Sequence, residues 1–128
     1  MNRAAAEAVR FLQGEDEMAR FVRERVRMDV NGMFWLKRDD ALRLLELLEP
    51  FDAVILWGDV GRETADDIVC TYDNWHYEGS DPQKSLRRAR EYIKSYLEDG
   101  VWFHIVWQDR IDRYKALRKE GCPSVQGK

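Results

Sequence analysis

The stretch VWFHIVW, residues 101–107, has six apolar residues and one histidine in seven positions, so neither of its two faces is polar. A strand that is apolar on both faces is normally covered on both faces by other parts of the fold. We therefore expect an inner strand here. The rest of the chain must then supply the layers that cover it.

Hydrophobic periodicity upstream of this stretch predicts further strands and helices. Short runs rich in apolar and β-branched residues predict strands at 33–36, 52–58 and 67–73. Apolar residues at helical spacing predict helices at 3–27, 37–50, 81–100 and, more weakly, 109–120. The Gly-rich and acid-rich residues 58–67 are predicted to form a loop.

Several residues are typical of the ends of these elements. Asn31 and Gly32 between apolar residues indicate a type I′ turn. Asp39 is a good helix N-cap and Pro50 a helix terminator. Ser80 with Gln83 fits a capping box, Asp81 with Pro82 fits an N-cap and first turn, and Gly100 fits a left-handed C-cap.

Between residues 33 and 107 the predicted order is strand, helix, strand, strand, helix, strand. This order is that of an α+β fold, the split βαβ (ferredoxin-like) sandwich, here with an added N-terminal helix and a C-terminal helix. We expect one domain at 1–123 and a flexible tail at 124–128. The loop between the second and third strands either joins a hairpin or re-routes the sheet.

The composition is that of a globular, well-solvated chain, with 45% apolar and 35% charged residues among 128. The first twenty residues lack the uninterrupted apolar core of a signal peptide, and no apolar run approaches the roughly 20 residues of a membrane span. We therefore expect a cytoplasmic protein. Cys70 and Cys122 have no metal-ligand spacing, and we expect both to be free thiols.

Negative charge is concentrated in the middle of the chain. Residues 59–81 contain seven acids and one base, whereas residues 82–128 contain eleven bases and six acids. Like charges at this density either face solvent or meet a cationic partner. Four arginines between Arg20 and Arg27 suggest RNA binding as an alternative, but interleaved acids and the net charge of −3 count against it.

The stretch TYDNWHYEG, residues 71–79, combines aromatic and acidic side chains. Aromatic anchors within an acidic field are typical of surfaces that bind a basic protein. The alternative is that Tyr72 and Trp75 cap the core of the sheet. The predicted partner-binding residues share this stretch or the acid-rich segment before it: Asp59, Glu63, Asp66, Asp67, Tyr72, Asp73, Trp75, His76, Tyr77 and Glu78.

No catalytic constellation stands out. The chain has no G-x-S-x-G elbow, no phosphate-binding loop and no Rossmann glycine pattern. Asp73 and His76 are three residues apart, which places them on opposite faces of a strand, so we expect no metal site. We therefore expect no catalytic residues and no cofactor. A metal-dependent phosphoesterase that uses the acids at 59–73 stays an alternative.

The chain contains, in this order, the segments FWLKRDDALRLLELLEP, AVILWGDV, TYDNWHYE and AREYIKSYL. Together these segments resemble the small bacterial immunity proteins of polymorphic toxin systems, and in particular the immunity protein 40 family. The resemblance covers about residues 33–106. The positions that carry it are Gly58, Asp59, Val60, Tyr72, Asp73, Asn74 and Trp75.

The resemblance implies a non-catalytic protein, monomer or homodimer, that neutralises a cognate toxin, often a basic nuclease-type domain. Asp59, Asp73 and Trp75 would contact the toxin, while Gly58 and Val60 would be structural. We expect such a protein to bind neither nucleic acid directly nor a membrane. A phage-type inhibitor that blocks a nucleic-acid-binding defence complex by charge mimicry is the alternative partner class, since it also needs a basic target.

Overall fold

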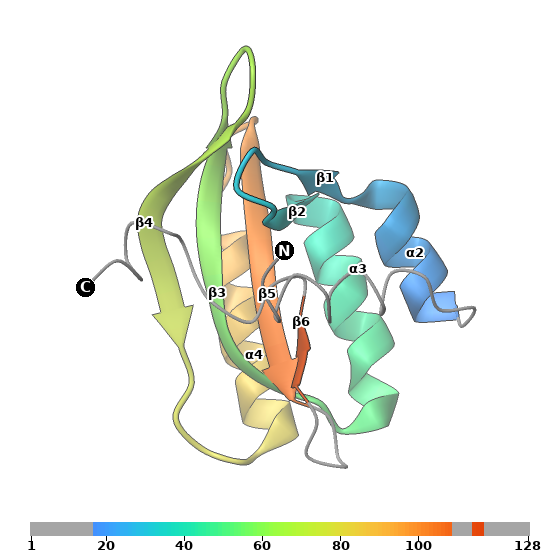
Figure 1. Ribbon diagram of the computed structural model, residues 1–128. Coiled ribbons are helices and arrows are strands. Elements are labelled where there is room, and N and C mark those ends of the chain that lie inside the picture. The colour runs from blue at the N-terminus through green and yellow to red at the C-terminus, as the bar shows by residue number, and fades with distance from the viewer. Residues whose placement is uncertain (1–16, 109–113, 117–128) are drawn as a thin grey trace.

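Strand β5, Val101–Gln108, lies inside the sheet of the computed structural model, which describes residues 17–108 and 114–116 (Figure 1). The strands run β1 Arg27–Met28, β2 Phe34–Lys37, β5, β3 Val54–Glu63 and β4 Ile68–His76 across the sheet, and every neighbouring pair is antiparallel. Every residue from Val101 to Trp107 is buried. The predicted inner strand is confirmed.

The helices make the fold α+β, as predicted. They are α2 Glu17–Arg25, α3 Arg38–Leu48 and α4 Pro82–Lys94, with a 3-10 turn, η1, at Glu49–Phe51. Helices α3 and α4 pack on the same face of the sheet and on each other, and α2 packs against α3 (Figure 1). Their apolar faces meet Phe103, Ile105 and Trp107 of β5 in the main core.

The ferredoxin-like topology is not confirmed. That topology would put the last strand at an edge and the first strand inside, whereas here β5 lies between β2 and β3. The apolar pattern of β5 fits this inner position, where both faces of the strand are covered. Each βαβ connection therefore skips one strand: β2 reaches β3 across β5, and β4 reaches β5 across β3.

Residues predicted as a loop instead extend the strands. Strand β3 continues to Glu63, and only residues 64–67 form the turn to β4. Two glycines allow β3 to continue, because a residue without a side chain lets large neighbouring side chains lie against the backbone. A Cβ built on Gly58 would lie 2.0 Å from the Trp75 ring, and one on Gly61 would lie 2.7 Å from Ile68. These glycines therefore mark close packing within a strand.

The turn before β2 is organised by a buried acid, Asp29, which no sequence pattern predicted. The Asp29 carboxylate accepts hydrogen bonds from the Asn31 and Met33 backbone N–H groups and, at 3.0 Å, from Trp35 Nε1. Gly32 has a φ of +83°, while Asn31 does not have a positive φ. The turn is therefore where it was predicted, but it is not type I′, which needs positive φ at both central residues.

The helix ends follow the predicted signals in part. Asp81 caps α4 by accepting from the Gln83 and Lys84 N–H groups, and Pro82 is the first helical residue. The helix ends at Lys94, before the predicted stop at Gly100. Asp39 is not the N-cap of α3, because the helix already starts at Arg38, after Lys37.

The prediction of a C-terminal helix at 109–120 is wrong for residues 114–116, which are the part of this range that the structure describes. Residues Tyr114–Ala116 form strand β6, which pairs with Val106–Gln108 at the end of β5. Strand β2 pairs with β5 only near Phe103, so this end of the same strand accepts another partner. Residues 1–16, the rest of the predicted last helix, the domain boundary at 123 and the tail lie outside the described residues.

Cys70 is disulfide-bonded, so the expectation of a free thiol at this position is wrong. Spacing along a sequence does not show which distant residues meet in the fold. Cys122 lies outside the described residues.

Substitution of Gly58 by alanine tests the close packing of β3. The added methyl would overlap the buried Trp75 ring, so we expect Gly58→Ala to lower the free energy of unfolding by about 2 kcal/mol or more. Urea unfolding followed by circular dichroism measures this. Arg87→Ala on the exposed face of α4 is the control and should change stability by less than about 0.5 kcal/mol. Equal stability of Gly58→Ala and wild type would contradict the packing.

Candidate functional site

The predicted contact residues do not share one exposed face. Asp59 is 4% exposed and Trp75 is 1% exposed. Trp75 lies opposite Gly58 and Asp59 lies opposite Asn74, so the two side chains project from opposite faces of the hairpin. The prediction that the Trp75 indole is presented outward with the acids is therefore wrong.

The other predicted residues are spread along the β3–β4 hairpin. Glu63 ends β3, and Asp66 and Asp67 lie in the turn at its tip. Tyr72 is exposed in the middle of β4, where its φ is +69°. The Asp73 carboxylate accepts a hydrogen bond from the Tyr96 hydroxyl at 3.0 Å.

The remaining three, His76, Tyr77 and Glu78, lie at the opposite end of β4 from the hairpin tip. His76 and Glu78 are exposed and Tyr77 is half-buried. The acids of the hairpin therefore have separate surroundings, and no described contact joins them into one group. Whether these exposed residues contact a partner stays a prediction.

Trp75 belongs to the main core. Its ring lies against Gly58 and 5.0 Å, between centroids, from the ring of Tyr92 on α4. Its indole Nε1 is buried without a hydrogen-bond partner among the described residues. Trp75 therefore positions β4 on the helix layer, and the alternative reading, a residue of the sheet core, holds for it.

Asp59 is a buried acid on the other face of the sheet. Within the part of the chain that the structure describes, its Oδ2 has no hydrogen-bond partner, and burial raises the pKa of Asp59 to about 6. His104 of β5 and Asn74 of β4 are its cross-strand neighbours. The His104 ring is itself buried, with Nδ1 3.1 Å from the Phe34 carbonyl oxygen. Asp59 is therefore out of reach of a protein partner.

A cleft of about 490 Å³ opens at the end of the sheet where β5 begins. Three segments that are far apart in the sequence form it: the β2–α3 junction, the end of β3, and the connection from α4 to β5. Its charged lining comprises five acids and two bases: Asp39, Asp40, Glu63, Glu98, Asp99, Lys37 and Arg38. Carboxylates therefore predominate in its walls.

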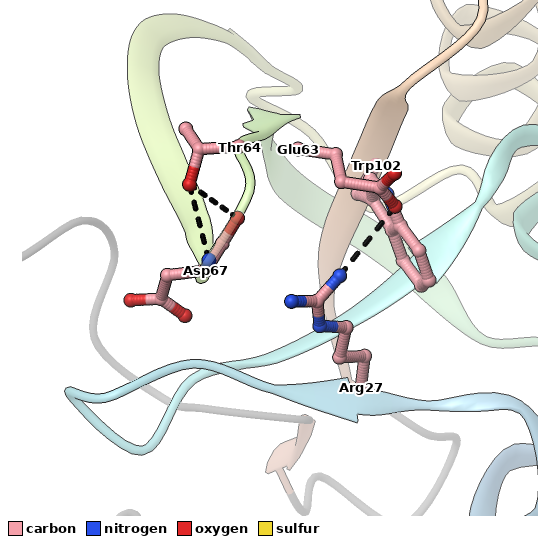
Figure 2. A network of polar contacts seen from close by, with 5 residues as sticks. All are labelled: Arg27, Glu63, Thr64, Asp67 and Trp102. Carbon is pink, nitrogen blue, oxygen red and sulfur yellow. Dashed lines mark hydrogen bonds and ion pairs between the residues drawn. The ribbon is translucent and has the colours of Figure 1, made fainter.

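Trp102 and Glu63 are held together in one wall of the cleft (Figure 2). The Trp102 Nε1–H donates to Glu63 Oε1 at 3.1 Å, and Arg27 Nη1 lies 3.5 Å from the same oxygen. At the hairpin tip the Thr64 hydroxyl bonds to the Asp67 backbone (Figure 2). Asp67 Oδ2 also accepts from the Val30 N–H at 3.4 Å, which ties the tip to the turn before β2.

The acids of the cleft differ in how strongly they are paired. Arg62 forms two hydrogen bonds to Glu98, at 2.8 and 2.9 Å, and this pairing lowers the pKa of Glu98. The Asp39 side chain is 93% exposed and 3.9 Å from Arg38. Asp99 forms no ion pair with another residue of the described chain. Asp39 and Asp99 are thus the carboxylates most available to an external cation.

Beside the cleft, Tyr96 and Asp73 join β4 to the end of α4. Burial, with hydrogen bonds to Tyr92 and Asp73, raises the pKa of the Tyr96 hydroxyl, which therefore stays a donor to the Asp73 carboxylate. Asp73 is thereby held against the molecule, so part of its capacity for outside contacts is already used.

The described residues contain no group of three or more His, Cys, Asp or Glu side chains arranged to hold a metal ion. The acids at 59–73, which the phosphoesterase alternative would need, do not converge. Within the same part of the chain no helix has the length and apolarity to cross a membrane.

The immunity protein 40 family model matches residues 26–107, which is more than half of the 128-residue chain. The chain therefore belongs to the immunity protein 40 family. Membership of an immunity protein family implies neutralisation of a cognate toxin. Neither a curated protein nor a solved structure matches the chain significantly.

Of the cleft residues, only Glu63 was predicted from the sequence to bind a partner. Trp102 was not predicted, because the apolar pattern of 101–107 assigns that residue to a core, and Trp102 is indeed only 6% exposed. Asp39, Asp40 and Asp99 were not predicted as binding residues, because their segments meet only in the folded sheet. No local pattern in the sequence connects these segments.

The buried Asp59 predicts a pH dependence of stability. Its pKa is raised from 3.8 to about 6, so between these values the folded state retains a proton that the unfolded state has released. The free energy of unfolding should therefore fall as the pH rises through this window. Asp59→Asn should remove this fall and stabilise the protein at pH 8 by about 2 to 3 kcal/mol.

Urea unfolding at pH 5 and pH 8 on both proteins tests the sign and size of the effect. Exposed Asp66→Asn is the matched control and should leave the wild-type pH dependence in place. A variant Asp59→Asn that loses stability at pH 8 would show that the carboxylate is stabilised by contacts other than those described.

Proposed function

We propose that this protein neutralises its toxin by binding it without catalysis, and that the charged cleft at the start of β5 is the centre of the contact surface. Family membership carries the proposal. The cleft supports its finer part because it is a concave surface with five carboxylates against two bases in its lining.

A basic nuclease-type domain fits such a surface best. Proteins that bind nucleic acid place lysine and arginine at the phosphates, so their active clefts are positively charged. Carboxylates that meet those cations occlude the substrate-binding groove and speed the encounter through electrostatic steering. The proposed mechanism is therefore steric and electrostatic blockage.

Residues of the hairpin extend the proposed surface beyond the cleft. Glu63 belongs to both, and the exposed Asp66 and the partly exposed Asp67 lie just beyond it at the hairpin tip. Tyr72 and His76 are exposed on β4 and Glu78 is exposed just after it, so these residues would meet only a toxin that covers most of the hairpin.

Charge reversal at the two least paired acids tests the proposal. We expect Asp39→Lys with Asp99→Lys to weaken toxin binding by about tenfold or more, because two attractive charges become repulsive. Survival of cells that co-express the cognate toxin, and calorimetry with an inactive toxin domain, measure protection and affinity. Binding should also weaken as salt increases.

The matched control is Glu46→Lys with Glu91→Lys, which makes the same change in net charge on exposed helix positions away from the cleft. Equal loss with both double variants would show a general charge effect and contradict the cleft as the contact. A wild-type chain that gives no protection would contradict the function itself.

We further propose that the protein acts in the cytoplasm of the toxin-producing cell. Fractionation of the toxin-producing cells, followed by immunoblotting, tests this location, and we expect the protein in the cytoplasmic fraction. Recovery of the protein mainly in the membrane fraction or the medium would contradict the cytoplasmic location.

A further inference from the structure

Trp102 already acts as a platform for cations of the chain itself. The Lys37 ammonium lies 5.5 Å from the centre of its ring system, and the Arg27 guanidinium lies 5.9 Å from it. Lys37 and Trp102 are cross-strand partners of β2 and β5, so this lysine is fixed beside the ring by the register of the sheet. Arg27 comes from the two-residue strand β1.

Arg27 is held weakly. Its distance to the ring is close to the roughly 6 Å limit of a cation–π contact. Its 3.5 Å approach to Glu63 is long for a charge-assisted hydrogen bond, which is normally about 2.8 Å. The two side chains are 36% and 44% exposed, so water screens the pair. By contrast, Arg62 holds Glu98 with two short bonds.

The Glu63 carboxylate is positioned to bind a cation more strongly than it binds Arg27. The Trp102 N–H fixes its Oε1, and within the described part of the chain both hydrogen bonds of the carboxylate use that one oxygen. Oε2 is therefore open to a second donor. A planar guanidinium can bond both carboxylate oxygens and lie on an indole at the same time, whereas an ammonium group acts as a point charge.

We propose that an arginine side chain of the toxin takes the place of Arg27, with its guanidinium on the Glu63 carboxylate and against the Trp102 ring. This inference rests on the proposed function and names the chemistry of its central contact. Arg27 is then an internal competitor that keeps the Glu63–Trp102 pair covered until the toxin binds.

The test titrates the intact protein with N-acetyl-arginine-methylamide and follows the Trp102 indole N–H resonance by NMR. This proton is the one that bonds Glu63, so it reports on the proposed contact directly. We expect a saturable shift with the arginine amide, at least about threefold larger than with the corresponding lysine amide. Arg27→Met should bind the arginine amide more tightly, and Glu63→Gln should abolish the shift.

Arg43→Met is the matched control, because Arg43 pairs with Glu46 on the exposed side of α3 and has no described contact with Glu63, Trp102 or a cleft carboxylate. It should titrate like the wild type. No shift with arginine, an equal shift with lysine, or no gain in Arg27→Met would overturn the inference. The spectra also show whether each variant is folded.

The titration contains no toxin, so its failure leaves toxin neutralisation standing. A protein that binds the arginine amide as described but gives no protection in cells contradicts the proposed function alone.

Discussion

The pairing of β5 on both edges, together with its burial on both faces, is the constraint on which the rest of the structure depends. Strand β5 pairs with β3 from Val101 to Gln108 and with β2 at Trp102 and Phe103. Because both neighbours are antiparallel to it, β2 and β3 are parallel to each other, and α3 must cross over β5 to connect them. The same register brings Lys37, Glu63 and Trp102 to one end of the sheet. The cleft is thus a direct consequence of the strand order.

Close packing on both faces of the sheet leaves two buried side-chain polar atoms of residues 17–108 without described hydrogen-bond partners. Trp75 Nε1 and Asp59 Oδ2 lie on opposite faces of the β3–β4 hairpin. A buried polar atom without a hydrogen bond costs roughly 1 to 3 kcal/mol. The burial of Trp75 against Gly58 and Tyr92 offsets this cost on the helix side. Asp59 has no comparable compensation among the described contacts. The free-energy cost of burying its charged carboxylate is the reason that its pKa is raised.

The charge pattern of the sequence and the charge pattern of the surface differ for a physical reason. Seven acids follow each other between residues 59 and 81, but a strand sends successive side chains to opposite faces and a hairpin carries them far along its length. Asp59 is therefore buried, Asp73 is bound to Tyr96, and Glu63 lies beside acids from two other segments. A linear cluster of charge did not become a surface cluster.

The sequence by itself determined the α+β class, the inner strand at 101–107, the Asp81 cap and the family, because periodicity, capping and short motifs are local properties. It also contained the argument against a ferredoxin-like order, since that order places the last strand at an edge. Only the tertiary structure decided the strand order, the burial of Trp75, the disulfide at Cys70 and the cleft. Each of these depends on contacts between residues distant in the chain, and the strength of such contacts is set by register and packing that no local pattern records.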